Sequence, residues 1–472
     1  MGQGSNGVRF TSGTALHFLL ILGACSCIGC SEKSTEPKNP RPSTGMKHLW
    51  SKRFGDGTTQ AAGAVSVDAS GNVIVTGNFN GAVDFGGGAL LSAGNNDIFV
   101  AKLGSDGSHL WSKRFGDGDI QEAHAVAVDA SGNVIVAGNF YGTVDLGGGA
   151  LTSAGSDDIY VAKLGPDGAH LWSKRFGDRS SQSARSVAID ASGNVIVTGD
   201  FYGVTDFGGG ALTSTGGDVY VAKFGSDGTH LWSKRFGDGD YQLANAVALD
   251  ASGSVIVTGV LNGSVDFGGG VLSSAGHSDI FIAKFGSDGT HLWSKRFGDG
   301  DYQGAYAAAV DASGNVIVTG YFYGTVDFGG GALTTAGGAV GVFIAKFGSD
   351  GAHLWSKSFS DGSYYMAPHS VAVDASGGVI ITGYLYGTVD FGGGALASAG
   401  ESDIFVAKFG FDGSHLWSKC FGDDATQYGE AVAVDASENV IIAGSFLGTV
   451  CFGGSALTSA GESDIFVAKF GR

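Results

Sequence analysis

The sequence predicts an all-β fold, a seven-bladed β-propeller of four-stranded antiparallel blades in which the N-terminal strand closes the last blade. Two observations predict it. The segment His-Leu-Trp-Ser-Lys occurs seven times at spacings of 60 to 62 residues. Each copy belongs to the same series of short apolar, β-branched runs separated by turn residues. Regular repeats of this kind are typical of sheets arranged radially around an axis.

Each repeat contains four candidate strands in a fixed order. In the second repeat, a strand ending at Asp129 is followed by Ala-Ser-Gly-Asn and by a strand that begins at Val134. An Asp-Ile-Phe-Val-Ala-Lys strand and the Trp strand come later, with Gly-Ser-Asp-Gly between them in most repeats. Such turn residues join antiparallel strands in hairpins. The Gly-Gly-Gly after Val-Asp-Phe is expected to be a simple bend.

The strands and the two ends of the array predict how the ring is built. Runs such as Ile98-Phe99-Val100 are apolar on both faces, so neighbouring blades must cover them. The array begins with a lone Trp strand, residues 48–55, and finishes on residues 464–471, the segment that precedes the Trp strand elsewhere. The first strand should therefore complete the last blade. A β-solenoid, which needs no such overlap, is the alternative architecture.

The repeat also resembles a known family. An inner strand, Asp-x-x-Gly-Asn-Val-x-Val-Thr-Gly, then Asp-x-Phe-Val-Ala-Lys and a Trp strand are similar to the bacterial SBBP family of β-propeller repeats over residues 47–472. This resemblance implies a seven-bladed propeller and an exported location, with no shared catalytic residue or ligand. The Asp-Gly-x-x-Leu-Trp segment is also similar to the Trp strand of quinoprotein propellers. The departures are Gly341 in place of Asp and Glu438 in place of Gly.

The segment before the repeats predicts export. Arg9 precedes an apolar run that is too short to span a membrane, so residues 1–24 are expected to be a lipoprotein-type signal peptide. Leu-Gly-Ala-Cys at its end resembles the lipobox of bacterial lipoproteins, with Cys25 as the lipidated anchor. Residues 25–46 then form the lipidated cysteine and a flexible linker. An ordinary signal peptide with incidental cysteines is the alternative. We expect a lipoprotein of the bacterial outer membrane or cell surface.

The seven tryptophans are expected to be structural. One tryptophan at a fixed strand position in every blade fits interblade packing, where a large ring buries much apolar surface. The expected interblade residues are Trp50, Trp111, Trp172, Trp232, Trp293, Trp355 and Trp417.

Calcium is the one cofactor that the sequence raises. Carboxylates are the ligands that Ca²⁺ prefers, and the Phe-Gly-Asp-Gly-Asp segments place pairs of them between blades. The candidate ligands are Asp117, Asp119, Asp238, Asp240, Asp299 and Asp301. The aspartates of the Asp-Ala-Ser-Gly-Asn turns are expected to cap those turns instead.

One pair of departures predicts a disulfide. In five repeats an Arg of the Trp strand is followed 31 residues later by Asp, as in Arg114 and Asp145, and in the last repeat the two positions are Cys420 and Cys451. We therefore expect Arg and Asp to meet, and a disulfide to replace that ion pair in an oxidising compartment. The alternative is two unrelated substitutions that leave free thiols.

Net charge and motifs limit the function classes. The net charge of −18 repels nucleic acid. No Gly-x-Ser-x-Gly elbow, zinc-ligand spacing or phosphate loop is present. The sequence therefore favours a non-catalytic, monomeric envelope lipoprotein that binds a protein, peptide or glycan. The alternative is a propeller enzyme, a hydrolase, lyase or quinone-dependent oxidoreductase, with an axial site.

The ligand is expected on the face that carries the interblade connections. Loop residues vary there, and tyrosines gather there, which give contact area at low entropic cost. The candidate ligand-binding residues are Tyr241, Tyr302, Tyr306, Tyr364, Tyr365 and His369.

Overall fold

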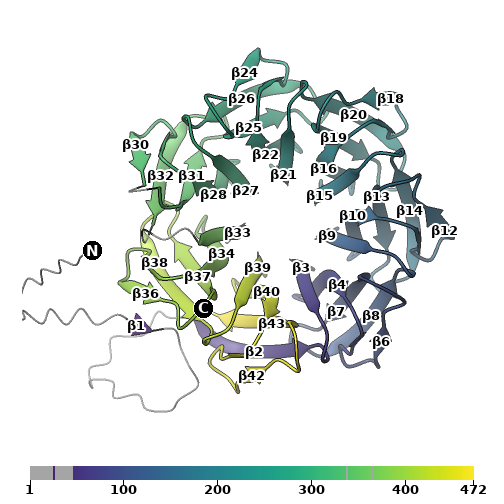
Figure 1. Cartoon of the computed structure of the whole chain (residues 1–472), viewed down its shortest axis with the longest axis vertical. Helices are drawn as coiled ribbons and strands as arrows, with labels where there is room; N and C mark the ends of the chain where they lie inside the picture. Colours follow the sequence, from purple (N-terminus) through teal and green to yellow (C-terminus); the bar gives the residue numbers. More distant parts are fainter. Residues whose placement is uncertain (1–24, 27–45, 336–337, 361, 363–364) are drawn as a thin grey trace, which may run out of the picture.

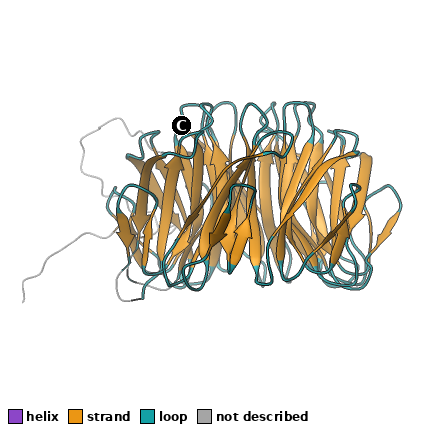
Figure 2. Cartoon of the chain, turned by 90° about the horizontal axis from the view of Figure 1, so that it is seen from above, coloured by secondary structure: helices purple, strands orange, loops and turns teal. Residues whose placement is uncertain are grey.

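The computed structural model describes residues 25–26, 46–335, 338–360, 362 and 365–472. They form a ring of seven four-stranded antiparallel sheets around a central axis, seen end-on in Figure 1 and as a flat cylinder in Figure 2. The described residues contain no helix, and so none that could cross a membrane. The predicted seven-bladed propeller is confirmed. The expected signal peptide and residues 27–45 of the expected linker lie outside the described residues.

Each blade runs from an inner strand at the axis to an outer strand at the rim. The inner strands are β3 (Gln60–Val67), β9 (Gln121–Val128), β15 (Gln182–Ile189), β21 (Gln242–Leu249), β27 (Gln303–Val310), β33 (Met366–Val373) and β39 (Gln427–Val434). The second strands are β4 (Val73–Phe79), β10 (Val134–Phe140), β16 (Val195–Phe201), β22 (Val255–Leu261), β28 (Val316–Phe322), β34 (Val379–Leu385) and β40 (Val440–Phe446). The third strands are β7 (Asp97–Leu103), β13 (Asp158–Leu164), β19 (Asp218–Phe224), β25 (Asp279–Phe285), β31 (Gly341–Phe347), β37 (Asp403–Phe409) and β43 (Asp464–Gly471). The outer strands are β8 (His109–Phe115), β14 (His170–Phe176), β20 (His230–Phe236), β26 (His291–Phe297), β32 (His353–Phe359), β38 (His415–Phe421) and β2 (Lys47–Phe54).

The ring closes as the sequence predicts. Strand β2, the first strand of the array, pairs antiparallel with β43, the last strand, and so becomes the outer strand of blade 7. Figure 1 shows the two side by side, purple against yellow. Their register places Lys47 opposite Gly471 and Phe54 opposite Ile465. Backbone hydrogen bonds between the two ends of the array thus hold the circle shut.

Every blade carries a small hairpin that the sequence analysis missed. The Gly-Gly-Gly segment is the tip of this hairpin rather than a simple bend. In blade 2, the Asp145 carboxylate accepts hydrogen bonds from the backbone N–H groups of Gly147 and Gly149, at 2.8 and 3.1 Å. Both glycines have φ near +105°, which favours glycine. The hairpins are β5 (Ala82–Val83) with β6 (Leu90–Leu91), β11 (Thr143–Asp145) with β12 (Ala150–Thr152), β17 (Val204–Asp206) with β18 (Ala211–Thr213), β23 (Ser264–Asp266) with β24 (Val271–Ser273), β29 (Thr325–Asp327) with β30 (Ala332–Thr334), β35 (Thr388–Asp390) with β36 (Ala395–Ala397), and β41 (Thr449–Val450) with β42 (Leu457–Thr458). The two-residue strand β1 (Cys25–Ser26) pairs in parallel with β36.

The core lies between the blades. The second and third strands are buried along almost their whole length, and each interblade space is filled by side chains from two sheets. Six of the tryptophans reach across this space, because each indole N–H donates to a backbone carbonyl in the next blade. The donor and acceptor pairs are Trp50 with Ser105, Trp111 with Pro166, Trp172 with Ser226, Trp232 with Ser287, Trp293 with Ser349, and Trp355 with Phe411, at 2.9 to 3.1 Å.

The turn aspartates do more than cap their turns. Asp129 accepts hydrogen bonds from the backbone N–H groups of Ser131 and Asn133, both at 2.9 Å. It also lies 2.9 Å from the ammonium group of Lys163 on the third strand of its own blade, and both side chains are more than nine-tenths buried. The same ion pair occurs in all seven blades. It ties the turn between the first two strands to the third strand.

The predicted contact between Arg and the Asp 31 residues later is wrong. Arg114 instead lies 2.7 Å from Asp97, which precedes it by 17 residues in the same blade. Asp84 and its counterparts hold the glycine tips of the small hairpins. The sequence separation of 31 still marks a real contact one residue further on, where phenylalanines such as Phe176 and Phe207 pack at 5.0 Å between blades.

The cysteines of the last two blades occupy the positions next to one of these phenylalanine pairs. Phe421 and Phe452 pack with ring centroids 5.1 Å apart. Cys420 and Cys451 each precede one of these phenylalanines, are buried, and are disulfide-bonded. A bond between them would connect the outer strand of blade 6 to the small hairpin of blade 7.

Candidate functional site

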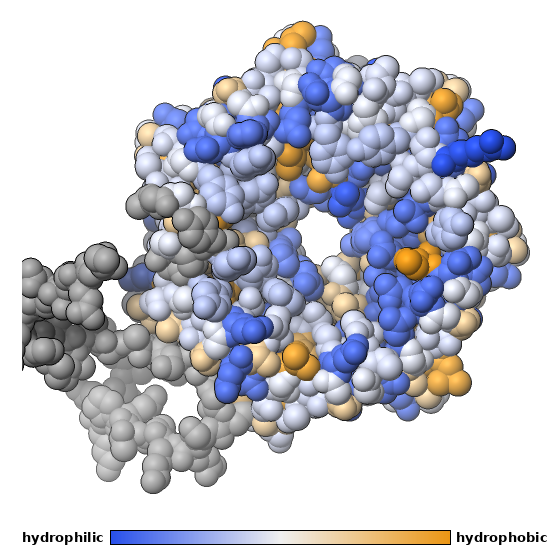
Figure 3. Space-filling model, viewed as in Figure 1, coloured by the Kyte–Doolittle hydropathy of each residue, from blue (hydrophilic) through white to orange (hydrophobic). Residues whose placement is uncertain are grey.

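A bulge in every inner strand places one residue on the central channel. In β9 the register with β10 shifts after Ala125, so that His124 has no partner across the pair. The same shift occurs at the fourth residue of all seven inner strands. These residues together line the channel, which is open through the molecule in Figure 3. They are Gly63, His124, Arg185, Asn245, Tyr306, His369 and Glu430.

These seven residues differ almost completely, although the strands around them are nearly identical. The pattern is Gln-x-Ala-x-Ala-Val-Ala-Val in most blades, and its fourth position is glycine, histidine, arginine, asparagine, tyrosine, histidine and glutamate in turn. The sequence analysis missed this ring and held that the blades offer little asymmetry, which is wrong for the channel. The signal was the variability of one position within a constant strand.

One arc of the channel, over blades 2 and 3, is charged. His124 Nε2 lies 2.6 Å from the side-chain oxygen of Asn139 and 3.5 Å from the carboxylate of Glu122. The hydrogen bond between Glu122 and His124 lowers the pKa of Glu122, against the opposing effect of burial. Arg185 Nε donates to Asp200 at 2.7 Å. The charges of this arc are therefore largely satisfied by one another.

The opposite arc, over blades 5 to 7, is aromatic. His369 Nδ1 lies 2.6 Å from the carboxylate of Glu430 in the next blade. The His369 ring meets the ring of Tyr306 edge-on at 6.3 Å and that of Tyr384 at 5.3 Å. Tyr384 in turn meets Tyr428 at 5.1 Å. This arc combines one histidine–carboxylate pair with a set of tyrosine rings.

A cavity of about 660 Å³ opens beside the aromatic arc, at the junction of blades 5 and 6. Its volume lies in the range of small-molecule sites. Val340, Met366 and Ala367 contribute apolar lining. The polar part of its wall consists of five tyrosines and one carboxylate, and we call this set the tyrosine cavity. Its members are Tyr302, Tyr306, Tyr321, Tyr323, Tyr384 and Asp301.

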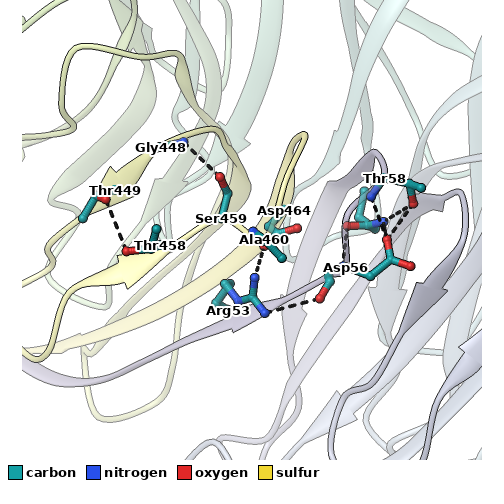
Figure 4. A network of polar contacts seen from close by, with 11 residues as sticks. Arg53, Asp56, Thr58, Gly448, Thr449, Thr458, Ser459, Ala460 and Asp464 are labelled. Carbon is teal, nitrogen blue, oxygen red and sulfur yellow. Dashed lines mark hydrogen bonds and ion pairs between the residues drawn. The ribbon is translucent and has the colours of Figure 1, made fainter.

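A buried polar cluster fills the corresponding place at the other junctions. At the junction of blades 1 and 2, the cluster consists of Asp97, Arg114, Gly116 and Gln121. Gln121 donates to Asp117 at 2.7 Å, and both Gln121 and Asp97 are fully buried. A Cβ atom on Gly116 would lie 2.2 Å from the Asp97 carboxylate, so glycine is required here. Figure 4 shows the arginine and aspartate of the same cluster, Arg53 with Asp464, at the ring closure.

All four members of this cluster are replaced at the junction of blades 5 and 6. Gly341 stands at the Asp position, Ser358 at the Arg position, Ser360 at the Gly position and Met366 at the Gln position. The hydroxyl of Ser360 donates to the carbonyl of Val340 at 2.9 Å instead. The other six junctions keep the aspartate, glycine and glutamine, and five of them keep the arginine. The tyrosine cavity thus lies at the one junction from which the cluster is missing.

The structure brings some of the predicted ligand residues together. Tyr302 and Tyr306 line the tyrosine cavity, and His369 adjoins it on the channel. Tyr365 is 63% exposed and packs against Tyr386. Tyr241 lies at the junction of blades 3 and 4, stacked on Tyr202 at 6.5 Å. Tyr364 lies outside the described residues.

The calcium candidates are occupied by hydrogen bonds. Asp117 accepts from the Gln121 amide and from the backbone N–H groups of Asp119 and Thr143, at 2.7 to 2.9 Å. Asp238 and Asp299 have equivalent contacts. Within the described part of the chain, no group of three or more His, Cys, Asp or Glu residues could hold a metal ion.

Comparison with known proteins gives distant likenesses. No family model matches the chain. Over 78% of its length the chain is 21% identical to an uncharacterized WD repeat-containing protein, L264, of Acanthamoeba polyphaga mimivirus, and it covers 34% of that protein. Sqt1 from Chaetomium thermophilum matches 91% of the chain and 100% of its own with a TM-score of 0.44 and 10% identity. A puromycin hydrolase mutant matches 86% of the chain and 54% of its own with a TM-score of 0.47 and 10% identity. The chain therefore spans about a third of its WD-repeat relative.

Proposed function

We propose that this chain is a non-catalytic binding scaffold of the cell envelope, and that it holds a protein, peptide or glycan partner at the tyrosine cavity. The observation that carries the proposal is the joint loss of the Asp, Arg, Gly and Gln cluster at the junction of blades 5 and 6. Packing alone favours the cluster, since the other junctions retain most or all of it. Departures from an otherwise consistent pattern are typical of functional sites.

The side chains at this junction also suit binding. Tyr302 and Tyr306 are 50% and 36% exposed, so their rings are accessible to a partner. Tyrosine supplies large amphipathic contact area while losing few rotamers, and it is enriched in binding surfaces. The cavity adjoins the channel through Tyr306, which lines both. A flexible segment of a partner could therefore enter the cavity and extend over the channel mouth.

The test is binding of residues 46–472, which contain the whole closed ring, to a panel of envelope proteins and glycans. Tyr306→Ala and Tyr321→Ala should each weaken binding by about tenfold, because alanine removes a ring that contacts the partner. Tyr141→Ala is the matched control, because Tyr141 occupies in blade 2 the position of Tyr323 in blade 5. Equal binding by all of these variants would rule out the cavity as the site.

The envelope location is also a proposal. We propose that Cys25 carries the lipid anchor and that the chain is an exported lipoprotein of the SBBP type. Disulfides persist in oxidising compartments outside the cytosol, so the disulfide-bonded Cys420 and Cys451 support export.

One observation favours an enzyme with an axial site as a second candidate. A histidine oriented by a carboxylate is a common general base, and His369 and Glu430 form such a pair on the channel. Hydrolase and lyase substrates should then be turned over by the wild-type chain but not by His369→Ala. Turnover that survives in His369→Ala, or none with any substrate, would remove this candidate.

A further inference from the structure

We propose that the tyrosine cavity binds an organic cation, an ammonium group with alkyl substituents that the partner carries. This inference rests on the proposed function, because it names the chemical group that the same cavity recognises. A choline-type head group and an alkylated lysine side chain share this chemistry.

The first argument is the arrangement of the rings. Tyr321 and Tyr323 meet at 6.2 Å with their planes 80° apart, and Tyr306 is tilted by 33° against Tyr321 at 5.2 Å. The rings therefore form walls at steep angles to one another. The face of an aromatic ring carries partial negative charge and attracts a cation within about 6 Å of its centre. Several rings around one space combine this attraction.

The second argument is charge. Asp301 is the one charged residue that lines the cavity, and no lysine or arginine is among the lining residues. The chain as a whole carries a net charge of −18, which attracts cations and repels anions. An anionic ligand would face both the carboxylate and the ring faces unfavourably. A cation satisfies both features.

The third argument is that the wall is preorganised. One face of the Tyr302 ring is stacked on His277 at 4.3 Å, with the planes 9° apart. The backbone of Ser278 also forms a bridge with Tyr302. Both contacts fix Tyr302 from the same side, at the edge of the cavity. A ring that is already held in place loses little entropy when a ligand binds.

Protonation keeps the rings suited to this role. Burial raises the pKa of Tyr306 well above its ordinary value, and it also raises the pKa values of Tyr321 and Tyr384. The phenols therefore remain neutral throughout the physiological range. A neutral sugar would use the same rings together with their hydroxyl groups, so the two ligand classes differ in their need for the hydroxyls.

The experiment measures binding of choline to residues 46–472 by calorimetry, beside dimethylbutanol, in which a carbon atom replaces the nitrogen. A tripeptide with a trimethyllysine at its centre forms a second arm, which tells a peptide source from a head group. We expect choline to bind about tenfold more tightly than dimethylbutanol, a difference of about 1.4 kcal/mol. Tyr306→Phe should keep this preference and Tyr306→Leu should lose it. Asp301→Asn should weaken choline binding and its dependence on salt.

Tyr141→Leu is the control for replacing a surface tyrosine, and a thermal melt shows that each variant folds. If Tyr306→Leu does not fold, Tyr323→Leu replaces it. Equal binding of choline and dimethylbutanol would overturn the inference, as would a loss in Tyr306→Phe as large as in Tyr306→Leu. Failure of choline to bind, or to compete with an envelope partner that depends on Tyr306, would overturn the inference while the proposed function stands. A panel with no partner at all would remove the proposed function itself.

Discussion

Arg114 and Asp97 lie 2.7 Å apart on neighbouring strands of blade 1, and this pair has a counterpart in four other blades. Blade 5 loses both partners, since Gly341 and Ser358 occupy their positions. Blade 6 loses only the arginine, because Cys420 stands in its place while Asp403 remains fully buried. The two blades therefore represent two different outcomes for the same buried carboxylate.

The first prediction concerns Asp403. Burial, with a smaller effect of the nearby Asp423 charge, raises its pKa to about 6. Because the folded pKa exceeds the unfolded one, this group favours folding below about pH 4, and the benefit is lost as pH rises through about 6. Asp403→Asn removes the charge, so it should stabilise the protein at pH 7 by about 2 to 3 kcal/mol relative to wild type. The difference should shrink toward zero at pH 4 in chemical denaturation.

Asp97→Asn is the matched control. It removes the partner of Arg114 and should destabilise the protein at pH 7 by about 1 to 3 kcal/mol. If the two variants change stability in the same direction at pH 7, the unpaired state of Asp403 is not what sets its pKa.

The second prediction restores the missing cluster. A variant with Gly341→Asp, Ser358→Arg, Ser360→Gly and Met366→Gln has the same residues as the other junctions. The new side chains should reduce the cavity, so the variant should fold with the circular dichroism of wild type and lose partner binding by tenfold or more, about 1.4 kcal/mol or above. Unchanged binding in a folded variant would show that the substitutions do not create the site.

The fold was predictable because it depends on periodicity. Seven tryptophans at one spacing and constant turn residues define the blades, and the unmatched end segments indicate how the ring closes. Partners within the repeat were harder to identify. In nearly identical repeats each arginine has aspartates at several fixed separations, and all of them recur together. Only a joint departure distinguishes them, and Gly341 with Ser358 is that departure.

The channel residues could not be derived from the alternation of the strand. A bulge inserts one residue and so changes which face the following side chains occupy. In β9 this shift follows Ala125 and leaves His124 on the channel. Nothing in the composition of the strand announces the bulge. The variability of the fourth position was visible, but it is a sign of function only once the position is known to face a shared space.

The third prediction concerns acid stability. Burial of Asp250 would raise its pKa, but hydrogen bonds from Ser252, Lys284 and Ser254 outweigh that effect and lower the pKa to about 2. A lowered folded pKa stabilises the fold above about pH 4, and the stability is lost as pH falls through about 2. Counterparts of this pair occur in every blade. The melting temperature should therefore fall steeply between about pH 4 and 2.

Asp250→Asn tests one of these groups. It should remove about 2 kcal/mol of stability at pH 7 and make the loss toward low pH shallower than in wild type. An identical slope in wild type and variant would show that Asp250 does not contribute to the acid transition.

The fourth prediction concerns the anchor. Cys25→Ser should release the protein from the membrane fraction into the soluble fraction, because serine offers no sulfur for a lipid. Cys27→Ser is the control and should stay with the membrane. Export should continue in both variants, as judged by protease accessibility in cells with a permeabilised outer envelope. Membrane retention of Cys25→Ser would place the anchor elsewhere.

The fifth prediction concerns Cys420 and Cys451. Peptide mapping without reductant should recover the two residues in one linked peptide, since each precedes a phenylalanine of one interblade pair. Such a bond closes about thirty residues and contributes about 3 to 4 kcal/mol through the unfolded state. Replacing both cysteines by alanine should lower stability by that amount, and reductant should then have no further effect. Restoring the consensus with Cys420→Arg and Cys451→Asp should recover part of the loss, because the new arginine lies beside Asp403, which would then titrate at a lower pH. Recovery with Cys451→Asp alone would contradict this pairing, since the arginine's partner is the aspartate of its own blade.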